Sequence, residues 1–313
     1  MSLMMLDGGM GTELARRGWD VTDSLWSARV LLEHPEAIEQ VHYDYLKAGA
    51  DCVTTASYQV SFEGFAKAGL AREAAAEALA RSVEVAKQAR LRFREKLGGR
   101  REPLVAASLG PYGASLADGS EYHGNYACSR ADLFVFHSAR MKCLHEAAPD
   151  LLACETIPSL AEAEVLLEAL WQFPTVTAWF SFACRDGEHT VHGEKLQDCV
   201  RALERERQVV AVGVNCTAAA YVDSLIRNIR AITRKPIVVY PNSGQTWNAS
   251  TRAWEGEAAP PRWEDCALAW RASGAQWIGG CCGTTPEDIR RMRNALEKKY
   301  PDSFPSAVGA KSK

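Results

Sequence analysis

Three of the ten cysteines in this sequence stand where two apolar segments end. Cys216 follows the run 209–215, and Cys281 and Cys282 follow the run 277–280 inside a glycine-rich turn. Three thiolates without a fourth protein ligand are typical of a tetrahedral zinc site that keeps one position open for catalysis. Sulfur ligands also favour zinc over magnesium or calcium. If the two segments are neighbours in the fold, these cysteines predict a catalytic Zn²⁺ site.

The same cysteines have a simpler interpretation. In that interpretation Cys216 is a small buried apolar residue, and Cys281 and Cys282 form a chance pair or a redox pair. The glycines on both sides of the pair, and the matching position of Cys216 at another segment end, favour the zinc site instead.

The segments that would position these thiols follow a repeating pattern. Short apolar runs alternate with longer segments of helical period, such as 71–97, which is typical of βα units on a parallel sheet. Eight βα repeats close naturally into a barrel, so we predict an α/β fold, a single-domain (β/α)8 TIM barrel. The expected strands are 3–7, 51–55, 104–108, 151–155, 176–182, 209–215, 237–240 and 277–280.

The first turn argues against an open, doubly wound sheet that binds a dinucleotide. Its glycines, Gly8, Gly9 and Gly11, lack the spaced dinucleotide pattern, and the expected acidic partner about 20 residues later is missing. No linker or break in composition precedes the polar end of the chain. We therefore expect one barrel domain over residues 4–304 and a polar tail over residues 305–313.

The overall composition excludes several classes of partner. The net charge of -3 gives no field that attracts polyanions, and the basic cluster at 90–101 is interleaved with Glu95. No apolar stretch approaches the roughly 18 residues that span a bilayer, and no secretory signal is recognisable. We expect a cytoplasmic protein with reduced thiols, with no nucleic-acid or membrane partner, that is a monomer or a small homo-oligomer.

In such barrels the chemistry is carried out where the strands end and the βα loops begin. Cys216 comes from one side of the seventh strand and the Cys281–Cys282 pair from the other, so the three thiols should converge at one end of the barrel. The other polar or thiol side chains at these points are Asp7, Thr55, Ser57, Ser108, Glu155, Cys184, Asn215 and Asn242.

Three motifs, in this order, resemble the homocysteine S-methyltransferase family: DGGMGT at 7–12, GVNC at 213–216 and GGCCGTTP at 279–286. The resemblance extends over essentially the whole chain. It implies that Cys216, Cys281 and Cys282 are the catalytic zinc ligands, and that the homocysteine thiolate takes the fourth position. The segments SLGPYGA at 108–114, DGSEY at 118–122 and YPNSG at 240–244 resemble the branch that uses S-methylmethionine as methyl donor.

The resemblance also implies a binding site for homocysteine. The two carboxylates of the site would hold the ammonium group, and backbone amides of the glycine turn would receive the carboxylate. The alternatives are a helix cap for Asp7 and a barrel-interior ion pair for Glu155. The residues assigned to the substrate are Asp7, Gly8, Gly9, Met10, Glu155 and Asn215.

The implied reaction moves a methyl group from a sulfonium to the homocysteine thiolate and yields methionine. Zinc supplies this thiolate, because the free thiol is mostly protonated at neutral pH. The donor leaves as a neutral thioether, so we assign no general acid. Aromatic faces suit a sulfonium, although core or loop packing explains each ring equally well. The candidate rings are Tyr58, Tyr112, Trp179, Phe182 and Trp247.

Other potential ligands rank lower. His189 and His192 have a spacing that metal ligands can show, but a polar loop is the simpler interpretation because the thiols already fill the site. Cys184 is the nearest rival ligand, and the family motif does not include it. The remaining cysteines are interpreted as buried or incidental thiols: Cys52, Cys128, Cys143, Cys154, Cys199 and Cys266.

Other functions fit parts of the same pattern. Within the family, a betaine-dependent enzyme, an S-adenosylmethionine donor, or a selenohomocysteine or selenocysteine acceptor would use the same residues. A barrel zinc hydrolase would activate water, although such sites favour histidine and carboxylate ligands. A zinc-storing or redox-sensing thiol protein would exchange metal or disulfides without methyl transfer.

Overall fold

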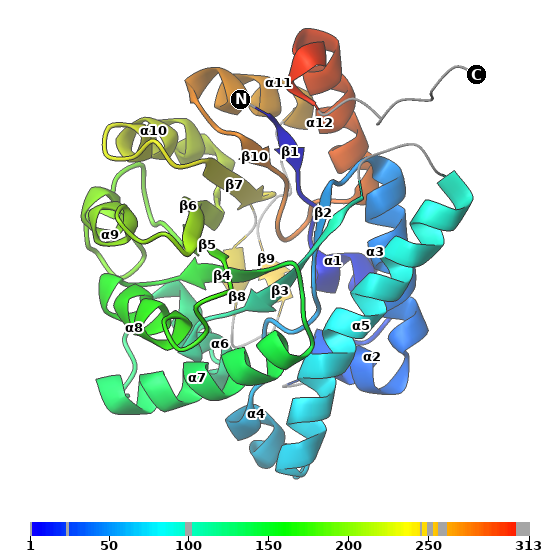
Figure 1. The fold of residues 1–313 in the computed structure, drawn as a ribbon, viewed down its shortest axis with the longest axis vertical. Helices are drawn as coiled ribbons and strands as arrows, with labels where there is room; N and C mark the ends of the chain where they lie inside the picture. Colours follow the sequence, from blue (N-terminus) through cyan, green and yellow to red (C-terminus); the bar gives the residue numbers. More distant parts are fainter. Residues whose placement is uncertain are drawn as a thin grey trace.

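The structure is a computed structural model that describes residues 2–22, 25–97, 102–244, 246–248, 253–255 and 262–304. Its centre is one sheet of eight parallel strands in the order β1-β10-β7-β6-β5-β4-β3-β2. A parallel bridge between Leu6 and Cys52 joins the two end strands, so the sheet closes on itself. The predicted (β/α)8 TIM barrel is therefore confirmed (Figure 1).

The barrel strands are β1 (Met4–Met5), β2 (Cys52–Thr54), β3 (Leu104–Leu109), β4 (Leu151–Ile157), β5 (Ala178–Phe182), β6 (Val209–Ala218), β7 (Ile237–Asn242) and β10 (Trp277–Ile278). Each one overlaps the strand predicted for that part of the chain. The first and last are shorter than predicted, whereas β6 and β7 extend further and carry their polar ends beyond the apolar run.

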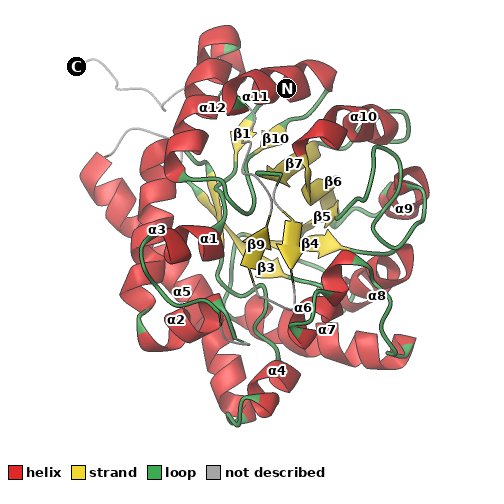
Figure 2. Ribbon diagram, turned by 180° about the vertical axis from the view of Figure 1, so that it is seen from behind, coloured by secondary structure: helices red, strands yellow, loops and turns green. Residues whose placement is uncertain are grey.

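Helices form a ring outside the strands (Figure 2). The predicted amphipathic helix over 71–97 is confirmed as α5, with Leu79, Val83 and Ala86 fully buried on its inner face. The helices of the described part are α1 (Met10–Arg16), α2 (Ser27–Glu33), α3 (Pro35–Ala48), α4 (Phe62–Lys67), α5 (Arg72–Leu97), α6 (Tyr112–Leu116), α7 (Arg130–Glu146), α8 (Leu160–Leu170), α9 (Leu196–Leu203), α10 (Ala219–Arg230), α11 (Trp263–Ser273), α12 (Pro286–Lys299) and the short 3-10 helices η1 (Ser120–Tyr122) and η2 (Pro301–Ser303).

Two apolar clusters hold the barrel together. The larger one fills the space between the strands and the outer helices. The smaller one fills the barrel interior, where small side chains such as Ala106, Ala153 and Ala211 surround Trp179 and Tyr240. Alternating strand residues point to the two clusters, which is why the strands read as nearly continuous apolar runs in the sequence.

The connection after β7 contains an antiparallel hairpin of β8 (Thr246–Asn248) and β9 (Ala253–Glu255). The hairpin projects onto the centre of the barrel, on the near side in Figure 2. Among the described helices, none is both long and apolar enough to cross a membrane. The predicted tail over 305–313 and the side chain of Trp247 lie outside the described residues.

Candidate active site

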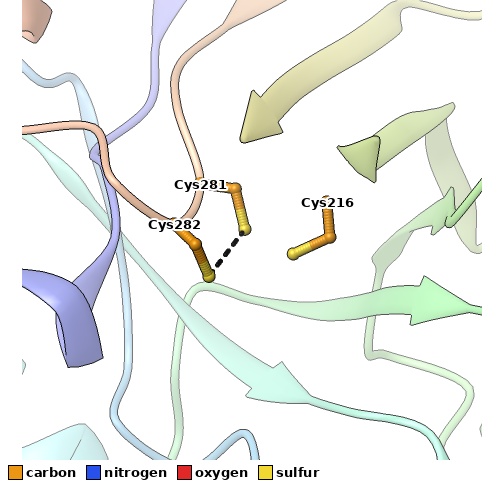
Figure 3. A group of neighbouring side chains, drawn as sticks. All are labelled: Cys216, Cys281 and Cys282. Carbon is orange, nitrogen blue, oxygen red and sulfur yellow. Dashed lines mark hydrogen bonds between the residues drawn. The ribbon is translucent and has the colours of Figure 1, made fainter. Parts of the chain in front are cut away.

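The three predicted zinc ligands come together at one end of the barrel (Figure 3). Cys216 lies near the end of β6, and Cys281 and Cys282 lie in the loop that follows β10, with β7 between the two strands. The three Sγ atoms lie within 4.8 Å of one another. The Sγ atoms of Cys281 and Cys282 are 3.9 Å apart.

The backbone around the thiols has little freedom. Cys216 has φ of 45°, a left-handed conformation that a non-glycine residue adopts only where its surroundings impose it. The strand register shifts there, between Asn215 and Ala218. On the other side, a Cβ on Gly280 would lie 2.2 Å from the Thr284 side chain, so only glycine permits this tight turn. Both cysteine segments are thus shaped for these thiols.

The spacing of the sulfur atoms fits a tetrahedral metal centre. Two thiolates bound to zinc at about 2.3 Å with a tetrahedral angle lie about 3.8 Å from each other. The separations here match that value for one pair and reach no more than 4.8 Å for the others. Among the described residues, no other group of three His, Cys, Asp or Glu side chains is close enough to hold an ion.

The thiols also perturb one another. Hydrogen bonds from Cys216 and Cys282 hold the pKa of the Cys281 thiol well below its usual value. Hydrogen bonding to Cys281 and burial, with the negative charge on Cys281, raise the pKa values of Cys216 and Cys282 well above the usual range. A divalent cation relieves this repulsion, since it favours the thiolate form of every ligand.

Asp7 lies in the same cavity and is buried. Its carboxylate accepts hydrogen bonds from the Thr54 backbone N–H at 2.7 Å and from the Thr54 hydroxyl at 3.0 Å. Burial outweighs these bonds and raises the pKa of Asp7 to about 7. The helix-cap alternative is not what the structure shows, because the N-cap of α1 is Gly9 and no side chain caps that helix.

Glu155, in β4, is the second buried carboxyl group of the cavity. It accepts a hydrogen bond from the Ser108 hydroxyl, and burial raises its pKa to about 8. The interior ion pair considered as its alternative is absent from the ion pairs between described residues. A buried carboxyl without a cationic partner is ready to receive one from a ligand.

Asn215 supports Glu155 through the neighbouring residue. Its side-chain oxygen accepts from the Thr156 backbone N–H at 2.7 Å, and its amide donates to the Thr156 hydroxyl at 2.8 Å. Thr156 has φ of 58°, so this pair of bonds stabilises an unfavourable backbone conformation beside Glu155. Asn215 lines the cavity, but its polar atoms already face Thr156.

The glycine turn packs directly against the cysteine loop. The Gly9 N–H donates to Thr284 O at 3.2 Å, and a Cβ on Gly9 would lie 2.7 Å from Cys281 O. The Tyr45 hydroxyl donates to Thr284 O at 2.9 Å and ties the same two loops together. Gly8 and Met10 line the cavity on either side of Gly9.

One cavity thus contains all the residues assigned from the sequence: Asp7, Gly8, Gly9, Met10, Glu155, Asn215, Cys216, Cys281 and Cys282. Sequence reasoning left out several other lining residues, among them Trp26, Thr54, Glu121 and Tyr122. The segment 118–122 had drawn attention only as part of a motif, and nothing in its local pattern indicates that Glu121 is buried.

The lower-ranked candidates fall as follows. Tyr58 lines the cavity, whereas Trp179 and Phe182 are fully buried and Tyr112 packs against Tyr126. Cys184 is not part of the thiol cluster. His189 pairs with Asp186 and His192 with Glu194, as a polar loop would.

Two groups of residues line the cavity. We call Cys216, Cys281, Cys282, Asp7 and Glu155 the thiol side, and Tyr58, Glu121 and Tyr122 the tyrosine wall. The loops that carry the wall are held by buried Arg140 of α7, whose guanidinium donates to Val60 O, Gly110 O and Tyr58 O, each at 2.8 Å.

The fold and the site define the class: a (β/α)8 barrel whose strand ends bring into one cavity two buried carboxyl groups and three thiols that could hold a metal ion. The sequence profile of the homocysteine S-methyltransferase family matches residues 4–296. The chain is 49% identical over 293 residues to homocysteine S-methyltransferase YbgG of Bacillus subtilis, covering 93% of each chain. It is 46% identical over 297 residues to homocysteine S-methyltransferase of Escherichia coli, covering 93% of this chain and 94% of that one.

Solved structures agree with the sequence comparison. The metallated form of the homocysteine methyltransferase MmuM from Escherichia coli superposes with a TM-score of 0.85 at 44% identity, covering 94% of this chain and 96% of that chain. The chain therefore belongs to the homocysteine S-methyltransferase family, a family of methyl-transferring enzymes.

Proposed function

We propose that this enzyme transfers a methyl group from a sulfonium donor, S-methylmethionine, to the thiolate of homocysteine and produces methionine, with Zn²⁺ held by Cys216, Cys281 and Cys282. The observation that carries the proposal is the convergence of the three Sγ atoms, within 4.8 Å of one another, in a cavity that also contains the buried carboxyl groups of Asp7 and Glu155. When bound, zinc supplies a Lewis acid that lowers the pKa of the homocysteine thiol.

The amino-acid part of homocysteine is recognised by the rest of the thiol side. Asp7 and Glu155 receive the ammonium group. Both carboxyl groups are buried, and the ammonium group gives them the positive charge that stabilises their ionised form. The carboxylate is received by the backbone amides of the glycine turn. The Gly9 amide already donates to Thr284 O, so Gly8 and Met10 supply the free donors of that turn.

The chemical step needs no proton donor. The homocysteine sulfur attacks the methyl carbon in line, the carbon–sulfur bond of the donor breaks, and its electron pair returns to the departing sulfur. A thiolate and a sulfonium thereby become two neutral thioethers. The protein's contribution is to hold the two sulfurs close together and to exclude water.

Other members of the class would use the same cluster. S-adenosylmethionine or betaine as donor, and a selenol as acceptor, fit the thiol side as well as S-methylmethionine and homocysteine do. A hydrolase is disfavoured because the ligand set contains only sulfur. A cytoplasmic location, a single domain over 4–304, and a monomer or small homo-oligomer stay predictions from the sequence.

The test is methionine formation by zinc-loaded protein, with homocysteine and, in parallel, S-methylmethionine, S-adenosylmethionine or betaine. We expect turnover with a sulfonium donor and about one zinc per chain by elemental analysis. No methionine from any donor, despite stoichiometric zinc, would contradict the proposal and lead back to the hydrolase and redox alternatives.

A further inference from the structure

Glu121 is a buried acid for which homocysteine binding provides no role. The residue is 5% exposed and lines the cavity from η1, in the loop that follows β3. Among the described residues, its Oε2 atom has no hydrogen-bond partner. Burying a carboxylate oxygen without a partner is costly, so such a group in a binding cavity points to a cationic ligand.

Close packing fixes the segment that carries Glu121. A Cβ on Gly113 would lie 2.5 Å from the Glu121 backbone N, so only glycine lets α6 pack so closely against η1. In addition, Glu162 of α8 accepts hydrogen bonds from the Tyr112 N–H at 2.6 Å and from the Tyr126 hydroxyl. These contacts lock the loop that presents Glu121.

Tyr58 and Tyr122 line the same cavity as Glu121 and the thiols. Burial raises the pKa of the Tyr122 hydroxyl well above its usual value, so this hydroxyl stays neutral. Burial likewise raises the pKa of the Tyr58 hydroxyl well above its usual value. A ligand in this cavity therefore has two aromatic side chains in its lining, and aromatic rings suit a sulfonium.

We propose that Glu121 binds the α-ammonium group of the methyl donor, while Tyr58 and Tyr122 face its sulfonium; this rests on the methyl transfer proposed above. The donor would then be a sulfonium that also carries an amino-acid group. Each of the two substrates has its own acidic partner, Asp7 with Glu155 for the acceptor and Glu121 for the donor.

The test compares two donors in the unaltered enzyme and in Glu121→Gln. One donor is S-methylmethionine, and the other is dimethyl(propyl)sulfonium, which has the same reacting centre without the amino-acid group. We expect Glu121→Gln to raise KM for S-methylmethionine about 10- to 100-fold, the loss of one charged hydrogen bond, and to leave KM for dimethyl(propyl)sulfonium and for homocysteine unchanged.

Asp118→Asn is the matched control. It removes a neighbouring negative charge but keeps the oxygen that accepts from Ser120 N at 3.0 Å, and Asp118 does not line the cavity. An equal KM increase in Asp118→Asn, an equal change for both donors, or no change for either would overturn the proposal.

The unaltered enzyme gives a second test that needs no variant. Its KM for S-methylmethionine should be at least about tenfold lower than that for dimethyl(propyl)sulfonium, and equal values would overturn the role of Glu121. If the unaltered enzyme methylates homocysteine while Glu121→Gln behaves normally, only this inference fails. If it forms no methionine from any donor, the proposed function fails and this inference falls with it.

Discussion

The thiol side and the tyrosine wall of the cavity are held in place in different ways. The thiol side stands at or just beyond the ends of β1, β4, β6 and β10, which the ladder of the parallel sheet aligns. The tyrosine wall stands on loops after β2 and β3 that Arg140 and Glu162 of the outer helices hold through hydrogen bonds. The comparison teaches that one half of the site depends on the sheet and the other on side chains far away in the sequence.

The largest effect should come from breaking the thiol side. Cys281→Ser should lower kcat/KM by more than about 100-fold and abolish stoichiometric zinc, because loss of a ligand should exceed the 10- to 100-fold cost of losing a second-layer partner. Elemental analysis and a methionine assay measure both effects. Cys184→Ala, a thiol outside the cluster, is the control, and an equal loss of zinc there would identify Cys184 as a ligand instead.

The next effect should come from a substitution of Arg140, which holds the loops of the tyrosine wall from α7. Arg140→Met leaves three carbonyl oxygens, two of them in buried hydrogen bonds, without their donor and should destabilise the protein by about 3 kcal/mol. KM for the donor should rise, while zinc binding stays intact. Chemical denaturation and donor titration measure these effects.

Arg94→Met gives the matched control for that change. It removes an exposed pair with Glu102 at 2.8 Å and should cost less than about 1 kcal/mol. Arg140→Met with unchanged stability and unchanged donor KM would mean that Arg140 does not hold the wall.

A smaller change separates the substrates on the thiol side. Glu155→Gln should raise KM for homocysteine about 10- to 100-fold, because a charged hydrogen bond to the ammonium is replaced by a neutral one. KM for the donor should stay within about twofold, on the same reasoning. Steady-state kinetics with each substrate varied in turn measures both KM values. An increase in KM confined to the donor would reverse the assignment of the two substrates to the thiol side and the tyrosine wall.

The two carboxyl groups of the thiol side should also make ligand binding depend on pH. The pKa of Asp7 is raised to about 7 and that of Glu155 to about 8, so both carboxyls gain charge as the pH rises from 6 to 8. An ammonium ligand should bind more tightly over this range, by up to about tenfold per pH unit for each group. Methionine is a suitable probe for calorimetry because it carries the ammonium but no thiol.

The same shifts act on stability with the opposite sign. Because the folded-state pKa values lie above the unfolded ones, the ligand-free protein should lose stability as the pH rises from about 4 through 8. Asp7→Asn should flatten both trends, and methionine binding that is independent of pH would contradict the assignment of the two carboxyls.

The positions that sequence reasoning found are those with a local pattern. Eight apolar runs indicated the barrel, and the place of Cys216 and the Cys281–Cys282 pair after two of them indicated the metal site. Asp7 and Glu155 were found because they too end apolar runs. Strand ends are readable in this way because alternation of apolar runs and turns is a short-range property of the chain.

The positions that sequence reasoning missed depend on distant contacts. Arg140 reaches Val60, 80 residues earlier in the chain, and no local pattern marks either partner. Asn215, which the motif assigns to the substrate, also bonds through its side chain to Thr156, 59 residues away. Sequence spacing could not separate a residue that faces the ligand from one that positions its neighbour.

By itself, the sequence determined the number of βα units, the place of the thiols at the ends of two of them, and the family to which they belong. Only the tertiary structure decided that the sulfurs lie within 4.8 Å of one another and that Glu121 is buried in the same cavity. The physical reason is that strands arise from local residue patterns, whereas loop positions and burial arise from packing between segments far apart in the chain.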